Sequence, residues 1–126
     1  MKIKNIDHLV LTVRDIDQTL GFYVNVLGMD KQSFGDGRVA LLFGEQKINL
    51  HEYGNEFEPK AHLPVPGSAD LCFITDTPLA QAMQQIIDRG VEIIDGPVKR
   101  TGANGPIESI YFRDPDLNLI EVSNYL

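Results

Sequence analysis

Cysteine and basic residues are scarce in this chain of 126 residues. Its single cysteine, Cys72, excludes an internal disulfide and is typical of a protein from a reducing compartment. Lys and Arg number 11 against 18 Asp and Glu, which gives a net charge of -7, and no basic stripe is present. The composition therefore argues against nucleic acid and anionic membranes as partners.

Long apolar runs are also missing. No stretch reaches the length of a membrane-spanning helix, and residues 1–7 contain neither an apolar core nor a small-residue cleavage site. We therefore expect no transmembrane helix, no signal peptide and a cytoplasmic location. The length suits one hydrophobic core, so the sequence predicts a single domain over residues 1–126.

The first half of the chain reads as a strand, a helix and three further strands. NIDHLVLTV (5–13) is apolar and β-branched, Asp15 can cap the helix that follows, and Gly28 suits the left-handed position after its end. Glycines then separate three short strand patterns. These strands are predicted at about 29–35, 37–43 and 46–52.

The second half repeats this order after a linker rich in proline and glycine at about 54–68. A strand is predicted at 69–75, and Thr77-Pro78 reads as an N-cap followed by a proline in the first helical position. The helix is predicted to run to Arg89, before Gly90. Strands follow at about 91–96, 107–113 and 118–124, the last two joined by a turn at 114–117.

A shift of 62 residues places Asp70 on His8 and Gly90 on Gly28, so a strand, a helix and a terminal glycine coincide. This offset predicts an internal duplication. The sequence thus favours an α+β fold of two βαβββ modules, at about 1–53 and 69–126, which form a cupped mixed β-sheet with helices on the outer face.

Alternation along the strands separates an apolar face from a face with polar groups. Leu9, Leu11 and Val13 share one face, and His8 lies on the other. The same alternation sets four further polar residues opposite apolar neighbours. They are Asn49, His51, Asp70 and Glu121.

Duplication relates the first strand to the fifth and the fourth strand to the eighth. We therefore expect His8, Asp70 and Glu121 to meet, together with His51 or Asn49. Nitrogen and carboxylate ligands suit a divalent first-row metal with open coordination positions. The ordinary alternatives are a hydrogen-bonded His8, a strand-capping Asp70 and a solvated Glu121.

Several stretches match a known family pattern. IDHLVLTVRDIDQTLGFYVNVLGM (6–29) and FRDPDLNLIEVSNY (112–125) resemble the opening and the closing hairpin of the vicinal oxygen chelate superfamily, which contains glyoxalases, bleomycin-resistance proteins and extradiol dioxygenases. INLHE, EFEPKAHLPVPGSADLCFIT and GPVKRTGANGPIESIYFRDPD are closer still to its subgroup called glyoxalase domain-containing protein 5. The resemblance covers essentially the whole chain.

The resemblance implies that His8 and Glu121 are metal ligands. Asp70 stands where the family commonly has histidine, and Asn49 stands where it commonly has glutamate or glutamine, with His51 as a replacement on the same face. The predicted metal ligands are therefore His8, Glu121, Asp70 and His51, for a nickel, zinc, manganese or iron ion, with Glu121 also as the catalytic residue. Leu117 stands where many relatives have a turn glycine.

The favoured function is a glyoxalase-like lyase or isomerase. A metal would chelate two neighbouring oxygens of a small substrate and stabilise an enediolate, while Glu121 or Asp70 moves the proton. One alternative is an extradiol dioxygenase using His8, His51 and Glu121; another is a metal-free binding protein of the bleomycin-resistance kind. Transfer of a thiol to fosfomycin is less favoured, because the sequence shows no anion-binding cluster; Arg100 and Arg113 are the nearest candidates.

Three further expectations complete the interpretation. Family members of this size commonly form homodimers, so we expect a homodimer with a twofold axis. Tyr111 and Arg113 share a strand face and are expected to border the substrate, although packing in the core is an equal explanation of Tyr111. Cys72 shares the face of Asp70, although a small buried residue is the more ordinary interpretation.

Overall fold

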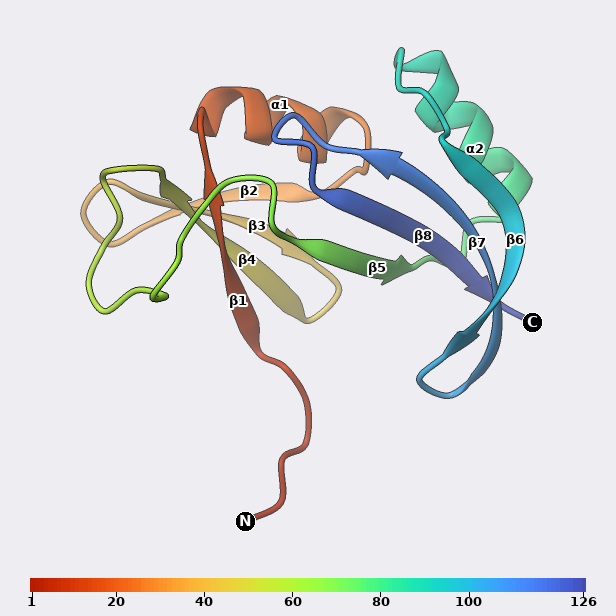
Figure 1. Cartoon of the computed structure of the whole chain (residues 1–126), viewed down its shortest axis with the longest axis horizontal. Coiled ribbons are helices and arrows are strands. Elements are labelled where there is room, and N and C mark those ends of the chain that lie inside the picture. Colours follow the sequence, from red (N-terminus) through yellow and green to blue (C-terminus); the bar gives the residue numbers. More distant parts are fainter. The chain divides into compact units, whose positions relative to one another are not determined.

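The computed structural model describes all 126 residues, which form two compact units, Met1–Pro66 and Gly67–Leu126. Each unit has the order β-α-β-β-β (Figure 1). The first contains β1 (His8–Val13), α1 (Ile16–Asn25), β2 (Asp30–Phe34), β3 (Arg38–Phe43) and β4 (Gln46–Glu52). The second contains β5 (Asp70–Ile74), α2 (Leu79–Asp88), β6 (Asp95–Gly102), β7 (Gly105–Arg113) and β8 (Leu119–Tyr125).

The two sheets have the same topology. Their strand orders are β1-β4-β3-β2 and β5-β8-β7-β6, with one parallel pair in each, β1 with β4 and β5 with β8. All other neighbouring strands are antiparallel. The predicted α+β fold of two βαβββ modules is therefore confirmed.

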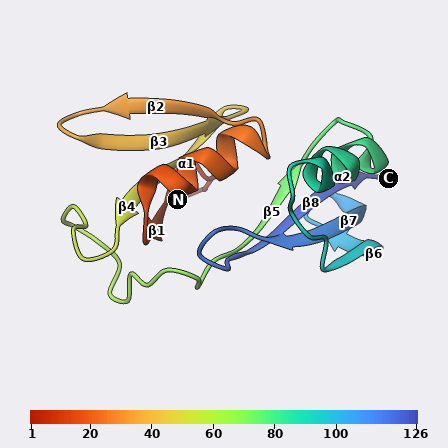
Figure 2. The same cartoon turned by 90° about the horizontal axis from the view of Figure 1, so that it is seen from above.

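Each helix covers one face of its own sheet, as Figure 2 shows for α2 over β7 and β8. The apolar strand residues predicted to lie beneath the helices are mostly buried there. In the first unit Tyr23 of α1 is fully buried with Val13 and Ile48, and in the second unit Ile86 of α2 is buried with Ile120. The opposite face of each sheet is therefore the one on which polar side chains are arranged.

The helix ends follow the sequence signals in the first unit more closely than in the second. Asp15 caps α1 by accepting a hydrogen bond from the backbone N–H of Gln18 at 2.9 Å. Thr77 does not cap α2: the N-cap is Pro78, without a side-chain hydrogen bond, and the helix begins at Leu79. The predicted Thr77 cap is thus wrong, because a residue from β8 supplies the acceptor instead.

Strand β6 lies later in the chain than the predicted 91–96. It begins at Asp95 and continues through Pro97 to Gly102, with a register irregularity between Asp95 and Val98. Proline is tolerated at this position because β6 is an edge strand and the bulge removes the need for a ladder hydrogen bond. The Gly96-Pro97 pair therefore interrupts the ladder without ending the strand.

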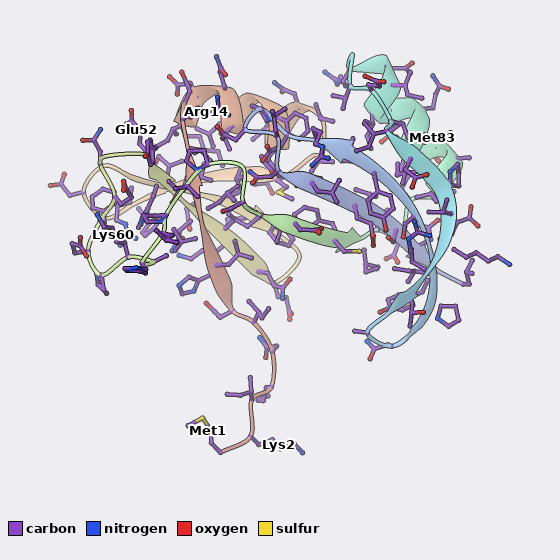
Figure 3. The ribbon with its side chains drawn as sticks, viewed as in Figure 1. Met1, Lys2, Arg14, Glu52, Lys60 and Met83 are labelled. Carbon is purple, nitrogen blue, oxygen red and sulfur yellow. The ribbon has the colours of Figure 1, made fainter.

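The segment between Glu52 and Asp70 contains no helix or strand, as its proline and glycine content predicts. Residues 1–7 also lack regular structure and are exposed. In Figure 3, Met1 and Lys2 lie at the end of this N-terminal segment, which extends away from β1. Neither helix is long and apolar enough to cross a membrane.

Candidate functional site

An open groove of about 440 Å³ lies on the face of the second sheet that α2 does not cover. Polar and charged side chains dominate its walls. The lining residues are Asp70, Ile94, Asp95, Arg100, Tyr111, Arg113, Leu119 and Glu121. Three carboxylates and two guanidinium groups therefore face one small space.

Glu121 occupies the centre of this surface because its strand, β8, has a neighbour on each side. It stands opposite Cys72 of β5 and opposite Tyr111 of β7. Residues that are paired across strands project from the same face of a sheet. The sheet register therefore brings a thiol and a phenol to either side of the Glu121 carboxylate.

Hydrogen bonds keep this carboxylate ionised. Burial alone would raise the pKa of Glu121, but hydrogen bonds from Cys72, Tyr111, Ser109 and Ser123 outweigh it, so that the pKa is lowered. The Ser123 hydroxyl donates to Oε2 at 3.4 Å. Glu121 is consequently an anion whose position is fixed by neutral donors.

The donors are themselves linked in a chain. The Ser109 and Ser123 hydroxyl oxygens lie 2.6 Å apart, and the Cys72 Sγ atom lies 3.4 Å from the Ser123 Oγ. Burial, and then the hydrogen bond to Glu121, raise the pKa of Cys72 to about 11. The thiol therefore remains a protonated donor at neutral pH.

Tyr111 connects Glu121 to the outer side of the groove. Burial and its hydrogen bond to Glu121 raise the pKa of Tyr111, while the Arg100 Nε donates to the phenol oxygen at 3.1 Å. Arg100 in turn forms an ion pair with Asp95 at 3.7 Å. The sequence indicated Tyr111 as a neighbour of the substrate and Arg100 as an anion-binding candidate, but it gave no sign that the two are hydrogen-bonded.

Asp70 lines the same groove at a different level of the sheet. It pairs with Leu119, two residues before Glu121 on β8, whereas Glu121 itself pairs with Cys72. The Asp70 and Glu121 backbones are therefore diagonal neighbours, about 7–8 Å apart. The structure thus places the two predicted carboxylates in one groove, on neighbouring strands.

In the first unit, His8 begins β1 and has an exposed ring. Its Nδ1 atom lies 2.7 Å from the Oδ2 atom of Asp7. A carboxylate that accepts from Nδ1 fixes the tautomer and leaves the lone pair of Nε2 outward, as in many metal-binding histidines. The adjacent Asp7, which the sequence interpretation overlooked, therefore orients the His8 ring.

Register also identifies the equivalent of Glu121 in the first unit. In the second sheet Cys72 of β5 stands opposite Glu121 of β8. Val10 is the residue equivalent to Cys72 under the 62-residue offset, and it stands opposite Asn49 of β4. Asn49 is buried, and its Oδ1 atom has no hydrogen-bond partner. Asn49 is therefore the counterpart of Glu121, as the family resemblance implied.

His51 lies farther along β4. It pairs with Thr12, whereas His8 pairs with Lys47, so four residues of strand, about 13 Å, separate their positions. His51 is buried beside the Phe57 ring, 5.7 Å between centroids, and its Nε2 atom has no partner. Desolvation and then the charge of Arg38 lower its pKa, so the ring is neutral. The fold does not bring His51 to His8.

No three His, Cys, Asp or Glu side chains within either unit are grouped so as to hold a metal ion. The ligand roles of His8, Glu121, Asp70 and His51 therefore stay predictions. Sequence reasoning did not identify the hydrogen bonds of Ser109 and Ser123 around Glu121. Ser123 lies two residues after Glu121, which is the spacing that sets it on the same strand face.

The fold agrees with the comparisons with known proteins. Residues 5–122 match the family described as the Glyoxalase/Bleomycin resistance protein/Dioxygenase superfamily, and the chain belongs to this family. The structure of an integron cassette protein from the mobile metagenome of V. cholerae is 67% identical, with a TM-score of 0.99, covering 100% of this chain and 98% of the other.

Two curated relatives are similar along almost the whole chain. The virulence protein STM3117 of Salmonella typhimurium is 59% identical over 126 residues, which are 100% of this chain and 88% of that protein. The glyoxalase domain-containing protein RDO1 of Mycosarcoma maydis is 55% identical over 125 residues, 99% of this chain and 70% of that protein. The finer assignment to glyoxalase domain-containing protein 5 stays a prediction.

Proposed function

We propose that this protein is a metal-dependent lyase or isomerase of the glyoxalase type, acting on a small substrate through two neighbouring oxygens. The observation that carries the proposal is the environment of Glu121. Four neutral donors hold its carboxylate as an anion in an open groove. An ionised and fixed oxygen ligand is what a catalytic metal site with open positions requires.

The proposed ligands carry the nitrogen and oxygen donor atoms that divalent first-row metals bind. His8 offers Nε2 because Asp7 engages the other ring nitrogen, and Glu121 offers a carboxylate oxygen. Asp70 is proposed as a third ligand and His51 as the least favoured, since it lies about 13 Å along the strand from His8. When bound, the metal would act as a Lewis acid that polarises the substrate oxygens.

The side chains of the groove have separate proposed roles in proton transfer and hydrogen bonding. A carboxylate with a lowered pKa is a good ligand but a weak base, so proton transfer by Glu121 requires a strongly acidified substrate C–H. Asp70 lines the same groove and is the second candidate for the base. Tyr111 donates its single O–H to Glu121 and so holds that carboxylate in place.

An extradiol dioxygenase is less well supported. It needs two histidines and one carboxylate on one ferrous ion. Because His8 and His51 lie at separate levels of the first sheet, they do not form the required pair. The lyase or isomerase proposal therefore has priority, with metal-free ligand sequestration as the outcome if no metal binds.

Calorimetric titration with Mn²⁺ tests the proposal in the full chain freed of metal by chelation. We expect stoichiometric binding by the parent and a loss of at least about tenfold in affinity for His8→Ala and Glu121→Gln. His62→Ala and Glu92→Gln, both exposed and outside the groove, are the matched controls. Circular dichroism establishes that each variant folds. A parent that binds no Mn²⁺, or equal affinity in all variants, would leave sequestration as the function.

The predicted homodimer remains part of the proposal. Isologous pairing is the commonest symmetry of small oligomers, and it would allow one chain to complete the ligand set of another. Light scattering at micromolar concentration is expected to give twice the mass of 14.1 kDa. A monomeric mass would contradict it.

A further inference from the structure

The positive charges of the groove differ in whether they have a partner. Arg100 is engaged: it pairs with Asp95 at 3.7 Å, donates to Tyr111 at 3.1 Å and donates to the Lys99 carbonyl at 3.0 Å. These contacts use Nη2, Nε and Nη1. Little of the Arg100 guanidinium is left for a ligand.

Arg113 has fewer partners than Arg100. Its one hydrogen bond runs from Nη1 to the Leu117 carbonyl at 3.3 Å, and it has no carboxylate partner. A guanidinium group carries five N–H donors in a planar fork, which matches the two oxygens of a carboxylate. Arg113 thus presents an uncompensated charge and several donors at the groove.

The sheet register fixes where this charge lies. Arg113 pairs with Leu119, and Tyr111, two residues earlier, pairs with Glu121. Both β7 residues line the groove, and two residues of strand correspond to about 7 Å. The backbone position of Arg113 is therefore separated from the Tyr111–Glu121 pair by about the length of a short carbon chain.

We propose that Arg113 binds a carboxylate group of the substrate, at the opposite end from the two neighbouring oxygens. The inference rests on the proposed function and narrows its substrate class to small organic acids. A singly charged carboxylate suits this groove better than a doubly charged phosphate, because Asp70, Asp95 and Glu121 repel each negative charge of the ligand.

A pair of probes that differ only in the distal group tests the inference. With the Mn²⁺-loaded protein, calorimetry compares 2-oxoglutarate with 2-oxopentanoate, which has the same 2-oxo acid end and the same chain length. We expect the parent to bind 2-oxoglutarate at least about tenfold more tightly, as a charged hydrogen bond allows. Arg113→Gln should remove this preference while leaving the affinity for 2-oxopentanoate unchanged.

Two further variants make the result specific. Arg113→Lys keeps the charge but not the fork and should retain part of the preference. Arg89→Gln removes an exposed arginine outside the groove and should retain all of it. Equal affinity of the parent for both probes, or an undiminished preference in Arg113→Gln, overturns the inference.

A second experiment distinguishes failure of the metal proposal from failure of the proposal that Arg113 binds a carboxylate. In the metal-free protein, chemical-shift titration compares glutarate with pentanoate, neither of which has a 2-oxo group. Tighter binding of glutarate by the parent, abolished in Arg113→Gln, supports the carboxylate site even if no Mn²⁺ binds. The absence of any such difference, together with normal Mn²⁺ binding, overturns the role of Arg113 alone.

Discussion

The side chain of Asn124, near the end of β8, accepts a hydrogen bond from the backbone N–H of Leu79, at the start of α2, at 2.8 Å. Its amide nitrogen donates to the carbonyl oxygens of Thr75 and Thr77 at 2.8 and 2.9 Å. One side chain therefore joins three backbone groups of the β5–α2 connection to the strand next to β5.

Replacement of Asn124 by alanine should lower the free energy of unfolding by about 2 kcal/mol, since it leaves a helix N–H and two part-buried carbonyls without their partner. Urea unfolding measures the change. Thr77→Ala is the control and should cost little, because Thr77 caps nothing. If Thr77→Ala lowered the free energy of unfolding more than Asn124→Ala, the result would support Thr77 as the N-cap of α2, as the sequence predicted.

Leu117 is the only residue other than glycine with a positive φ, at 68°. Its side chain is 62% exposed, so it gains little from packing. Leu117→Gly should therefore stabilise the protein by about 1 kcal/mol, because the left-handed strain disappears. Leu117→Ala retains the strain and should not stabilise. Thermal unfolding compares the three proteins, and a lower midpoint for the glycine variant would show that the turn is not strained.

Asp7 should influence metal affinity through His8. Asp7→Asn keeps the size of the side chain but removes the carboxylate that accepts from the ring. We expect Mn²⁺ affinity to fall by about tenfold, in line with other partners of ligating histidines. Asp17→Asn, in the exposed first turn of α1, is the control. Unchanged affinity in Asp7→Asn would mean that the pair is a surface contact only.

Cys72 should react slowly with iodoacetamide at pH 8. Only the thiolate reacts, and a pKa raised from 9.0 to about 11 lowers its fraction by about a hundredfold. The rate should rise as pH increases towards 11. Glu121→Gln removes a charge that raises the pKa of Cys72, so the reaction at pH 8 should become faster. A parent rate equal to that of the urea-unfolded chain would contradict the shifted pKa.

Most of the fold could be predicted from the sequence, because helix caps, terminal glycines and strand alternation are local signals. Asp15 caps α1 by its own side chain, and Gly28 and Gly90 adopt positive φ angles after the helices. Strand alternation correctly assigned Leu11, Ile48 and Ile120 to the buried faces. β6 and the cap of α2 were misjudged because a bulge and a long-range side chain determine them, and neither has a local pattern.

The candidate site could be predicted from the sequence only in part. Alternation places residues on a face but does not give their level along the strands, which depends on register between distant segments. For this reason strand alternation left His51 and Asn49 as equivalent candidates, whereas the pairing of Asn49 with Val10 separates them. The hydrogen bonds among Ser109, Ser123 and Glu121 depend on the same register.

The equal strand order of the two sheets also affects which amino-acid substitutions such a protein can accept. A single module that pairs with a second copy of itself must carry the same residue at both related positions, so any substitution appears twice. Here the equivalent positions have diverged, with His8 matched by Asp70 and Asn49 by Glu121. Because both modules lie in one chain, each equivalent position can be substituted alone, and the two sheets present different side chains there.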